Sequence, residues 1–298
     1  MGVKGLIYKR KILGYVFLLP MAVLLCTFMY YPIGNSIFMS FTNWSGFELN
    51  YDFIGLRNYE RLFFEMPEYW QAMWVNIRFA TISTTIQTIL GFFLAVGVLN
   101  LTRRWQDFFK ISLYLPVILP AAVVAIMWRF IYTPDFGLIN QLLRAMSLDS
   151  WARAWTADPT WALPAVIFTN TWRYVGFTMV LYYVSLLGIP TEMLESAQVD
   201  GATYWQRIRY FYFPLTRGTT EINFVLSITG GLRAFDMFFL LTQGGPGGRT
   251  KVVGMWILET AFQSFRFGRA LAMSIILFLI VVTAMLISRF ILAPRHDN

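Results

Sequence analysis

The sequence has almost none of the residues that build disulfides, metal centres or hydrolytic triads. Its 298 residues include one cysteine, Cys26, and one histidine, His296. A single cysteine cannot form an intrachain disulfide, and together these two residues cannot supply the ligands of a zinc site. One histidine near the C-terminus also provides no Ser-His-Asp triad. We therefore predict no catalytic residue, no metal site and no enzymatic activity in this chain.

Charged residues are also scarce. Lys, Arg, Asp and Glu make up 13% of the chain, and hydrophobic residues make up 57%, whereas soluble domains carry about 25% charged residues. This composition predicts an integral membrane protein. The net charge of +8 would suggest nucleic acid in a soluble protein, but membrane proteins concentrate Lys and Arg in cytoplasmic loops beside anionic lipid. No nucleic-acid partner is expected.

Several apolar stretches are long enough to cross a membrane, which takes about 20 residues as a helix. Six such stretches lie at residues 12–31, 73–98, 111–132, 161–187, 221–241 and 271–292. The first is too long for a signal peptide and no small-residue cleavage site follows it, so it is interpreted as a signal anchor and first helix. With no linker or internal repeat, residues 1–298 are predicted to form one all-α, polytopic transmembrane domain.

Basic residues are unevenly distributed between the loops. Segments 1–11, 99–110, 188–218 and 294–298 together carry Lys and Arg at more than twice the density of segments 35–72, 134–160 and 242–268. The positive-inside rule therefore predicts that both termini are cytoplasmic. In the long outer loop, residues 58–74 are predicted to form an amphipathic helix on the membrane interface.

Residues 190–215 interrupt the apolar pattern on the predicted cytoplasmic side, and they indicate two short helices joined by a turn. Thr191 is expected to cap the first helix, and Gly201 to end it at a positive φ where any Cβ would clash. Thr203 opens a T-x-x-Q capping box for the second helix, which Pro214 stops. From the residues alone, the segment either lies on the membrane surface or docks onto a cytoplasmic partner.

The spacing within this segment resembles the EAA loop of permease subunits of binding-protein-dependent ABC importers. That motif is Glu-Ala-Ala, three residues, Gly, nine residues, Ile, one residue and Leu-Pro. The matching positions here are Glu195, Ser196, Ala197, Gly201, Phe211, Phe213 and Pro214. Serine replaces one alanine and phenylalanine replaces both aliphatic residues, but the spacing is intact. Residues 53–63, 114–132, 235–250 and 265–274 also resemble the carbohydrate-importing branch, the maltose-type and glycerol-phosphate-type permeases.

The resemblance implies a type I ABC importer permease in the cell membrane of a prokaryote. It implies a second, homologous permease subunit, two copies of a cytoplasmic ATPase that holds the ATP and Mg, and an extracytoplasmic sugar-binding protein. Glu195 would pair with an ATPase arginine and Ala197 would lie against the ATPase groove. The ATPase-coupling residues implied by the resemblance are Glu195, Ser196, Ala197, Asp200, Gly201, Ala202 and Pro214. Residues 243–250 lack the first Gly and the Lys of a phosphate-binding loop, so no cofactor is expected in this chain.

Polar and small residues inside two spans point to a substrate pathway, because polar groups in a span usually face a bundle interior or water. The candidates are Asn170, Arg173, Tyr174, Phe177, Ser227, Gly230, Gly231 and Ala234. Amide and guanidinium groups can bind sugar hydroxyls, and aromatic rings can cover sugar C–H edges. Alternatively, the glycines allow close helix packing, and Arg233 forms a structural ion pair with Asp236.

Together these features predict the permease subunit of an ATP-driven importer of a mono- or oligosaccharide. One alternative is a glycerol-phosphate-type solute, which Arg173 would bind through its charge. A second alternative is an ion-coupled secondary carrier, which needs carboxylates in mid-span and an inverted repeat. Asp236 is the one clear acidic candidate for such coupling, and no inverted repeat is evident.

Overall fold

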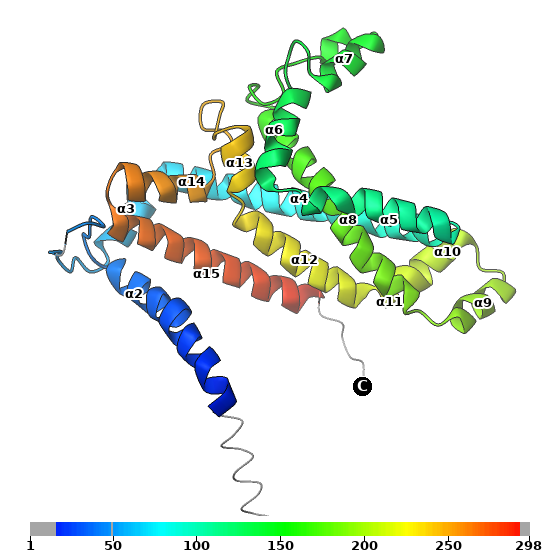
Figure 1. Ribbon diagram of the computed structural model, residues 1–298, viewed down its shortest axis with the longest axis horizontal. Helices are drawn as coiled ribbons and strands as arrows, with labels where there is room; N and C mark the ends of the chain where they lie inside the picture. Colours follow the sequence, from blue (N-terminus) through cyan, green and yellow to red (C-terminus); the bar gives the residue numbers. More distant parts are fainter. Residues whose placement is uncertain (1–15, 49, 293–298) are drawn as a thin grey trace, which may run out of the picture. The chain divides into compact units, whose positions relative to one another are not determined.

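The computed structural model describes residues 16–48 and 50–292. Within these residues the chain is built of helices and short connections, with no β-strand and one isolated antiparallel bridge between Thr42 and Phe53 (Figure 1). The predicted all-α class is confirmed. The chain divides into two compact units. The first unit comprises residues up to Pro67 and Ile257–Ile276, and the second comprises Glu68–Trp256 and the residues from Leu277 onward.

The first unit contains an apolar helix over Val16–Met39. A wider π-helical turn, Cys26–Tyr30, leads into its last part, α2 (Tyr31–Met39). None of its most apolar stretch is buried by the rest of the protein, which is the environment expected of a helix that lipid covers. The helix continues eight residues beyond the predicted end at residue 31. Residues 12–15 of the predicted span lie outside the described residues. The predicted cytoplasmic segments 1–11 and 294–298 also lie outside them.

The single amphipathic helix that the sequence predicted over 58–74 in the predicted outer loop is not formed. Helix α3 (Arg57–Phe64) ends at Glu65, and a new helix begins at Pro67. Proline has no N–H to continue a helix but suits the first helical turn, and this explains the interruption. The remaining helical segments of the unit are the π-helical turn Glu259–Gln263 and the start of α15 (Phe267–Leu292).

The second unit is a helical bundle. Its helices in chain order are α4 (Pro67–Leu99), α5 (Arg103–Ile118), α6 (Ala121–Ile131), α7 (Leu138–Ala145), the 3₁₀ turn Asp149–Trp151, α8 (Ala162–Leu187), α9 (Thr191–Val199), α10 (Tyr204–Arg207), the π-helical turn Ile208–Tyr212, α11 (Phe213–Leu215), α12 (Arg217–Leu232), α13 (Asp236–Leu241) and α14 (Val253–Leu258). Helix α5 packs along α8, and α6 packs against α13.

Two of the predicted spans are broken. Residues 111–132 form α5 and α6, which meet at 100°, because Pro120 holds Leu119 in an extended conformation that a helix cannot continue through. Residues 221–241 are divided between α12 and α13 by a break at residues 233–235. In the part of the chain that the structure describes, three helices are long and apolar enough to cross a membrane, and two bent pairs pass the same test together. Six spans with cytoplasmic termini stay a prediction.

Buried amides join the helices of the second unit. Asn76 on α4 donates to the carbonyl of Leu232 (3.0 Å) and accepts from the backbone N–H of Val253 (2.9 Å). Asn223 on α12 accepts from the hydroxyl of Thr178 and donates to that of Thr88, both at 3.0 Å. Buried polar groups of this kind are stable only when they are hydrogen-bonded, so these contacts fix how α4, α8 and α12 face one another.

Candidate functional site

The eight residues predicted to form a substrate pathway surround one cavity of about 560 Å³ in the second unit. Helix α8 supplies four of them, α12 supplies three, and Ala234 lies in the break between α12 and α13. The volume falls within the range of small-molecule sites, about 300–1,000 Å³. Two separate sequence stretches therefore line a single candidate binding site.

The small residues on α12 divide into two roles. A Cβ added to Gly231 would lie 2.7 Å from the Cα of Ala80 on α4, so this glycine permits close helix packing. A Cβ added to Gly230 would meet no atom within 4 Å, so this glycine keeps space open at the cavity. The packing alternative holds for Gly231 but does not account for Gly230.

Arg173 in the cavity wall is held by a hydrogen bond to the backbone between α5 and α6, where the predicted third span is broken. Its Nη2 donates to the carbonyl of Leu119 (2.9 Å), which lies between α5 and α6, and its guanidinium lies 5.1 Å from the ring centre of Tyr174. Its Nε is buried and has no hydrogen-bond partner within residues 16–48 and 50–292. The unpaired donor is available to a ligand, since a buried donor without a partner carries a free-energy cost.

The alternative of an Arg233–Asp236 ion pair is wrong for the described residues, where no ion pair joins the two side chains. Arg233 instead follows the last residue of α12 and its Nε donates to the carbonyl of Thr229 (3.4 Å). Asp236 is the first residue of α13. A cation at a helix C-terminus and an anion at a helix N-terminus are both favoured by the helix dipole, so each charge is placed by its own helix end.

Several cavity residues were missed by sequence reasoning. Gln87 and Phe79 line the cavity from α4, and Tyr114 lines it from α5. Gln87 also donates to the carbonyl of Asn170 (3.4 Å). A glutamine in the middle of an apolar run was a signal in the sequence, by the same rule that singled out Asn170. Phe79 and Tyr114 carried no such signal, because aromatic residues are common throughout this chain.

The predicted coupling segment is two short helices, α9 and α10, and α9 turns away from α8 at 77°. Gly201 has φ +79°, which confirms the predicted positive φ. The predicted Cβ clash is wrong, because no atom lies within 4 Å of a Cβ added there. The constraint on Gly201 is the backbone conformation alone. Asp200 ends α9, and the backbone N–H of Ala202 donates to the carbonyl of Ala197 (2.9 Å).

The helix ends in this segment follow the prediction in part. The capping box is confirmed, since Thr203 N–H donates to Gln206 Oε1 (2.7 Å) and Gln206 N–H donates to Thr203 Oγ1 (3.4 Å). The prediction that Thr191 caps α9 is wrong, because Pro190 holds the cap position and Thr191 is already helical.

Pro214 does not stop the second helix. The chain widens into the π-helical turn Ile208–Tyr212 and continues through Pro214 to Leu215. A proline inside a helix lacks the N–H that the preceding turn needs. After Pro214 the helical pattern resumes, since the backbone N–H and the hydroxyl of Thr216 both donate to the carbonyl of Tyr212 (3.1 and 2.8 Å).

The segment is anchored to the bundle by one face. Leu194, Ile208 and Tyr212 pack into the core cluster formed by α4 and α8. Ala197 is buried inside this chain, with 4% of its surface exposed, so the prediction that it lies against a partner's groove is wrong. Glu195 lies two positions before Ala197, and residues two positions apart lie on nearly opposite sides of a helix. Because Ala197 faces the bundle, the exposed Glu195 points outward.

A second outward residue was missed. Val199 lies four positions after Glu195 on α9 and is 87% exposed. Residues at i and i+4 are neighbours on a helix surface, so the outward face of α9 presents a carboxylate beside an apolar side chain. The i+4 spacing was visible in the sequence, but the inward direction of Ala197 was not. Ser196 donates to the carbonyl of Met193 (3.0 Å) and remains within its own helix.

Known proteins resemble this chain over nearly its whole length. Residues 87–296 match the family described as binding-protein-dependent transport system inner membrane component. The probable ABC transporter permease protein YurN of Bacillus subtilis is 37% identical, covering 93% of this chain and 94% of that protein. The trehalose/maltose transport system permease protein MalF of Thermococcus litoralis is 28% identical, and the match covers 93% of this chain and 92% of that protein.

The fold also has a close counterpart among solved structures. A chain of a bacterial ABC transporter involved in the import of the acidic polysaccharide alginate matches with a TM-score of 0.83 at 24% identity. The match covers 97% of this chain and 98% of that chain. The arrangement of helices described above is therefore shared almost from end to end.

Proposed function

Since the chain belongs to the family of inner membrane components of binding-protein-dependent transport systems and is an ABC importer permease of the cell membrane, we propose that it passes a sugar. The trehalose/maltose and alginate relatives are named for saccharides. Family membership also excludes an ion-coupled secondary carrier. The proposed solute is a mono- or oligosaccharide received from an extracytoplasmic binding protein.

The observation that carries this proposal is the make-up of the cavity wall. Asn170 and Arg173, which carry planar hydrogen-bonding groups, line the cavity together with the rings of Tyr174 and Phe177. Hydroxyl groups need donors and acceptors of this kind, and the C–H edges of a sugar ring need an aromatic face. A site with convergent polar groups on an aromatic wall is suited to a polar, ring-shaped solute.

A second candidate solute is an anionic one, such as a glycerol-phosphate-type compound. The buried, unpaired Nε of Arg173 favours it, because a guanidinium in a fixed position binds carboxylate or phosphate strongly. Uptake assays with a neutral saccharide and with a glycerol-phosphate-type compound, each with its binding protein, distinguish the two candidates.

The partners follow from the same proposal. A second permease subunit, homologous to this one, would complete the pore, and two copies of a cytoplasmic ATPase would hold ATP and Mg. The outward face of α9, with Glu195 and Val199, supports docking by the ATPase, because it offers an apolar contact and a charge side by side, and interfaces combine an apolar core with a polar rim. This chain would then carry no cofactor of its own.

Replacing Gly230 with phenylalanine is expected to reduce sugar uptake at least tenfold while the protein still folds. The new side chain starts in open space at the cavity and would occupy volume that the solute needs. The measurement is uptake of labelled sugar into vesicles that contain the complete transporter. Gly218→Phe is the matched control, because a Cβ there also meets no atom within 4 Å and the residue does not line the cavity. Normal uptake by the Gly230 variant would remove this cavity from the pathway.

Replacing Gly201 with valine is expected to uncouple ATP hydrolysis from transport. A β-branched residue at φ +79° costs about 1–3 kcal/mol of backbone strain, which would shift the turn between α9 and α10. The ratio of sugar transported to ATP hydrolysed should fall, while membrane insertion is retained. Gly218→Val, where φ is not positive, should keep the wild-type ratio. An unchanged ratio in the Gly201 variant would contradict a coupling role for this turn.

A further inference from the structure

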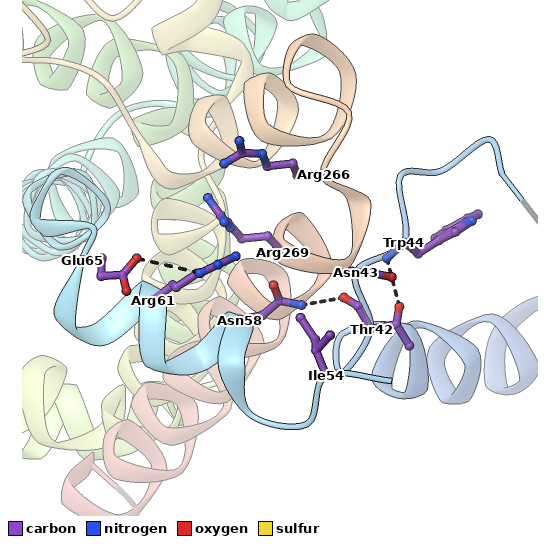
Figure 2. A pocket seen from close by; sticks show the side chains of 9 residues that line it. All are labelled: Thr42, Asn43, Trp44, Ile54, Asn58, Arg61, Glu65, Arg266 and Arg269. Atoms are coloured by element: carbon purple, nitrogen blue, oxygen red, sulfur yellow. Dashed lines mark hydrogen bonds and ion pairs between the residues drawn. The ribbon is translucent and has the colours of Figure 1, made fainter. Parts of the chain in front are cut away.

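A cavity of about 460 Å³ in the first unit is not used by the proposed transport path (Figure 2). Its walls come from two stretches far apart in the sequence, residues 42–65 and 266–269. Three arginines and one glutamate are its charged residues, and its other lining residues are neutral. The cavity is therefore a basic one.

The positive charge of this cavity is only partly neutralised. Arg61 on α3 pairs with Glu65, the residue that follows this helix, with 3.8 Å between Nε and Oε2. Arg266 and Arg269 form no ion pair within the described residues, and Arg61 and Arg266 both repel Arg269. The Nε of Arg269 is buried and has no hydrogen-bond partner in the described part of the chain. Within these residues, this buried donor lacks an acceptor.

The backbone adds further positive potential at the same place. Helix α15 is 26 residues long and begins at Phe267, so Arg266 precedes its first turn and Arg269 lies within it. A helix N-terminus carries a partial positive charge and favours anions, whereas cations there are unfavourable. Two arginines at this helix end, beside a third from α3, would be stabilised by a bound anion.

The cavity walls are fixed by contacts that do not involve the arginines. Asn58 donates to the carbonyls of Ser40 (2.9 Å) and Thr42 (2.8 Å), and the N–H of Gly268 donates to the carbonyl of Trp44 (3.0 Å). A Cβ on Gly268 would clash with the carbonyl oxygen of Thr42. Because the two stretches approach this closely, the cavity is formed before any ligand binds.

The position of the cavity indicates the kind of anion. The apolar helix Val16–Met39 ends three residues before Thr42, and the apolar helix Phe267–Phe290 begins at the cavity. The ends of two such helices mark the level where the hydrocarbon core meets the lipid headgroups. Exposed phenylalanines of the same unit, Phe47, Phe53, Phe64 and Phe265, agree with this level, since interfacial segments bury apolar side chains at the boundary between headgroups and acyl chains.

We propose that this cavity binds the phosphate of an anionic membrane phospholipid, with Arg266 and Arg269 as its ligands. Arginine matches phosphate because its planar fork donates two parallel hydrogen bonds. The acyl chains would lie along the exposed apolar surface of α2. A phospholipid is favoured over a soluble protein partner because it is always present at this depth. The proposal does not depend on which solute the permease carries.

The test uses the purified full-length chain, stripped of lipid in detergent and mixed with phosphatidylglycerol, phosphatidylcholine or inorganic phosphate. Native mass spectrometry then measures how much of each stays bound. The wild type is expected to retain one phosphatidylglycerol more tightly than phosphatidylcholine or inorganic phosphate. Each arginine near an anionic lipid contributes about a fivefold factor in affinity, so R266Q/R269Q together should weaken phosphatidylglycerol binding about 25-fold.

Two further variants make the result decisive. E65Q removes the one carboxylate of the cavity and should strengthen phosphatidylglycerol binding about fivefold, the opposite direction from any loss caused by misfolding. R57Q removes an arginine of α3 that does not line the cavity and should leave binding unchanged. Equal effects of R57Q and R266Q/R269Q would overturn the proposal. Retention of inorganic phosphate as tight as that of phosphatidylglycerol would also overturn it. So would an R266Q/R269Q variant that binds the extracytoplasmic binding protein more weakly but retains phosphatidylglycerol as the wild type does.

Discussion

Replacing Gly176 with valine is expected to prevent the second unit from folding. A Cβ at this position of α8 would clash with the backbone carbonyl of Leu113 on α5. Backbone in a packed helix cannot move aside as a side chain can, so the cost should exceed the roughly 1–3 kcal/mol of ordinary overpacking and reach about 4 kcal/mol or more. The measurement is the yield of monodisperse protein in detergent and its thermal unfolding midpoint.

Gly97→Val is the matched control for this substitution. Gly97 also lies inside a long helix, α4, but a Cβ added there meets no atom within 4 Å. Valine and glycine differ by less than about 1 kcal/mol in helix propensity, so this variant should fold in near-normal yield. Equal losses in both variants would mean that helix propensity, and not the contact between α5 and α8, limits folding.

The close approach at Gly176 is also what forms the cavity wall. It brings the end of α5 near Arg173, whose Nη2 then reaches the carbonyl of Leu119. Tyr114 and Ile118 of α5 line the cavity for the same reason. A partial loss of this packing, for example in Gly176→Ala, would therefore affect both stability and the candidate binding site.

The sequence predicted the helices better than it predicted their breaks. Apolar length was enough to place α8 within one residue of its observed start, because a continuous apolar run has few alternatives to a helix. The break at Pro120 was visible as a proline in the run, but prolines also occur inside helices, as Pro116 and Pro214 do here. Whether a proline bends, breaks or is tolerated depends on which neighbouring groups replace the lost donor.

In the candidate sites, the sequence likewise predicted which residues share a helix face but not which neighbouring helix they meet. Helical spacing correctly grouped residues such as Asn170 and Arg173 on one side of α8. It could not separate Gly230 from Gly231, because their difference lies in the position of α4. Nor could it predict that Ala197 faces inward, since that depends on how α9 folds back on the bundle.

The arginine cavity lay beyond sequence reasoning altogether. Arg61 and Arg266 are about 200 residues apart, and no spacing rule relates residues at such a distance. Each is an ordinary loop or helix arginine when taken alone. The close approach of Gly268 to Thr42 is what makes them neighbours, and only the three-dimensional structure shows it.

Replacing Glu195 with lysine is expected to release the ATPase from the purified transporter. The proposal is that Glu195, exposed on the outward face of α9, pairs with a cation of the ATPase, while Val199 covers apolar surface beside it. Reversing one charge of such a pair costs about 2–5 kcal/mol when the partner is left desolvated, which lowers affinity roughly 30-fold to several-thousand-fold. Val199→Asp should act in the same direction, because it places an unpaired charge against apolar surface.

The measurement is the amount of ATPase that co-purifies with each tagged variant, together with sugar uptake by the same preparation. Glu60→Lys is the matched control, since it makes the same charge reversal at an exposed position of α3 on the predicted outer side. It should retain the ATPase fully. If Glu195→Lys and Val199→Asp also retain the ATPase at the wild-type ratio and support uptake, then α9 is not the docking element, and the segment is a helix pair that lies on the membrane surface.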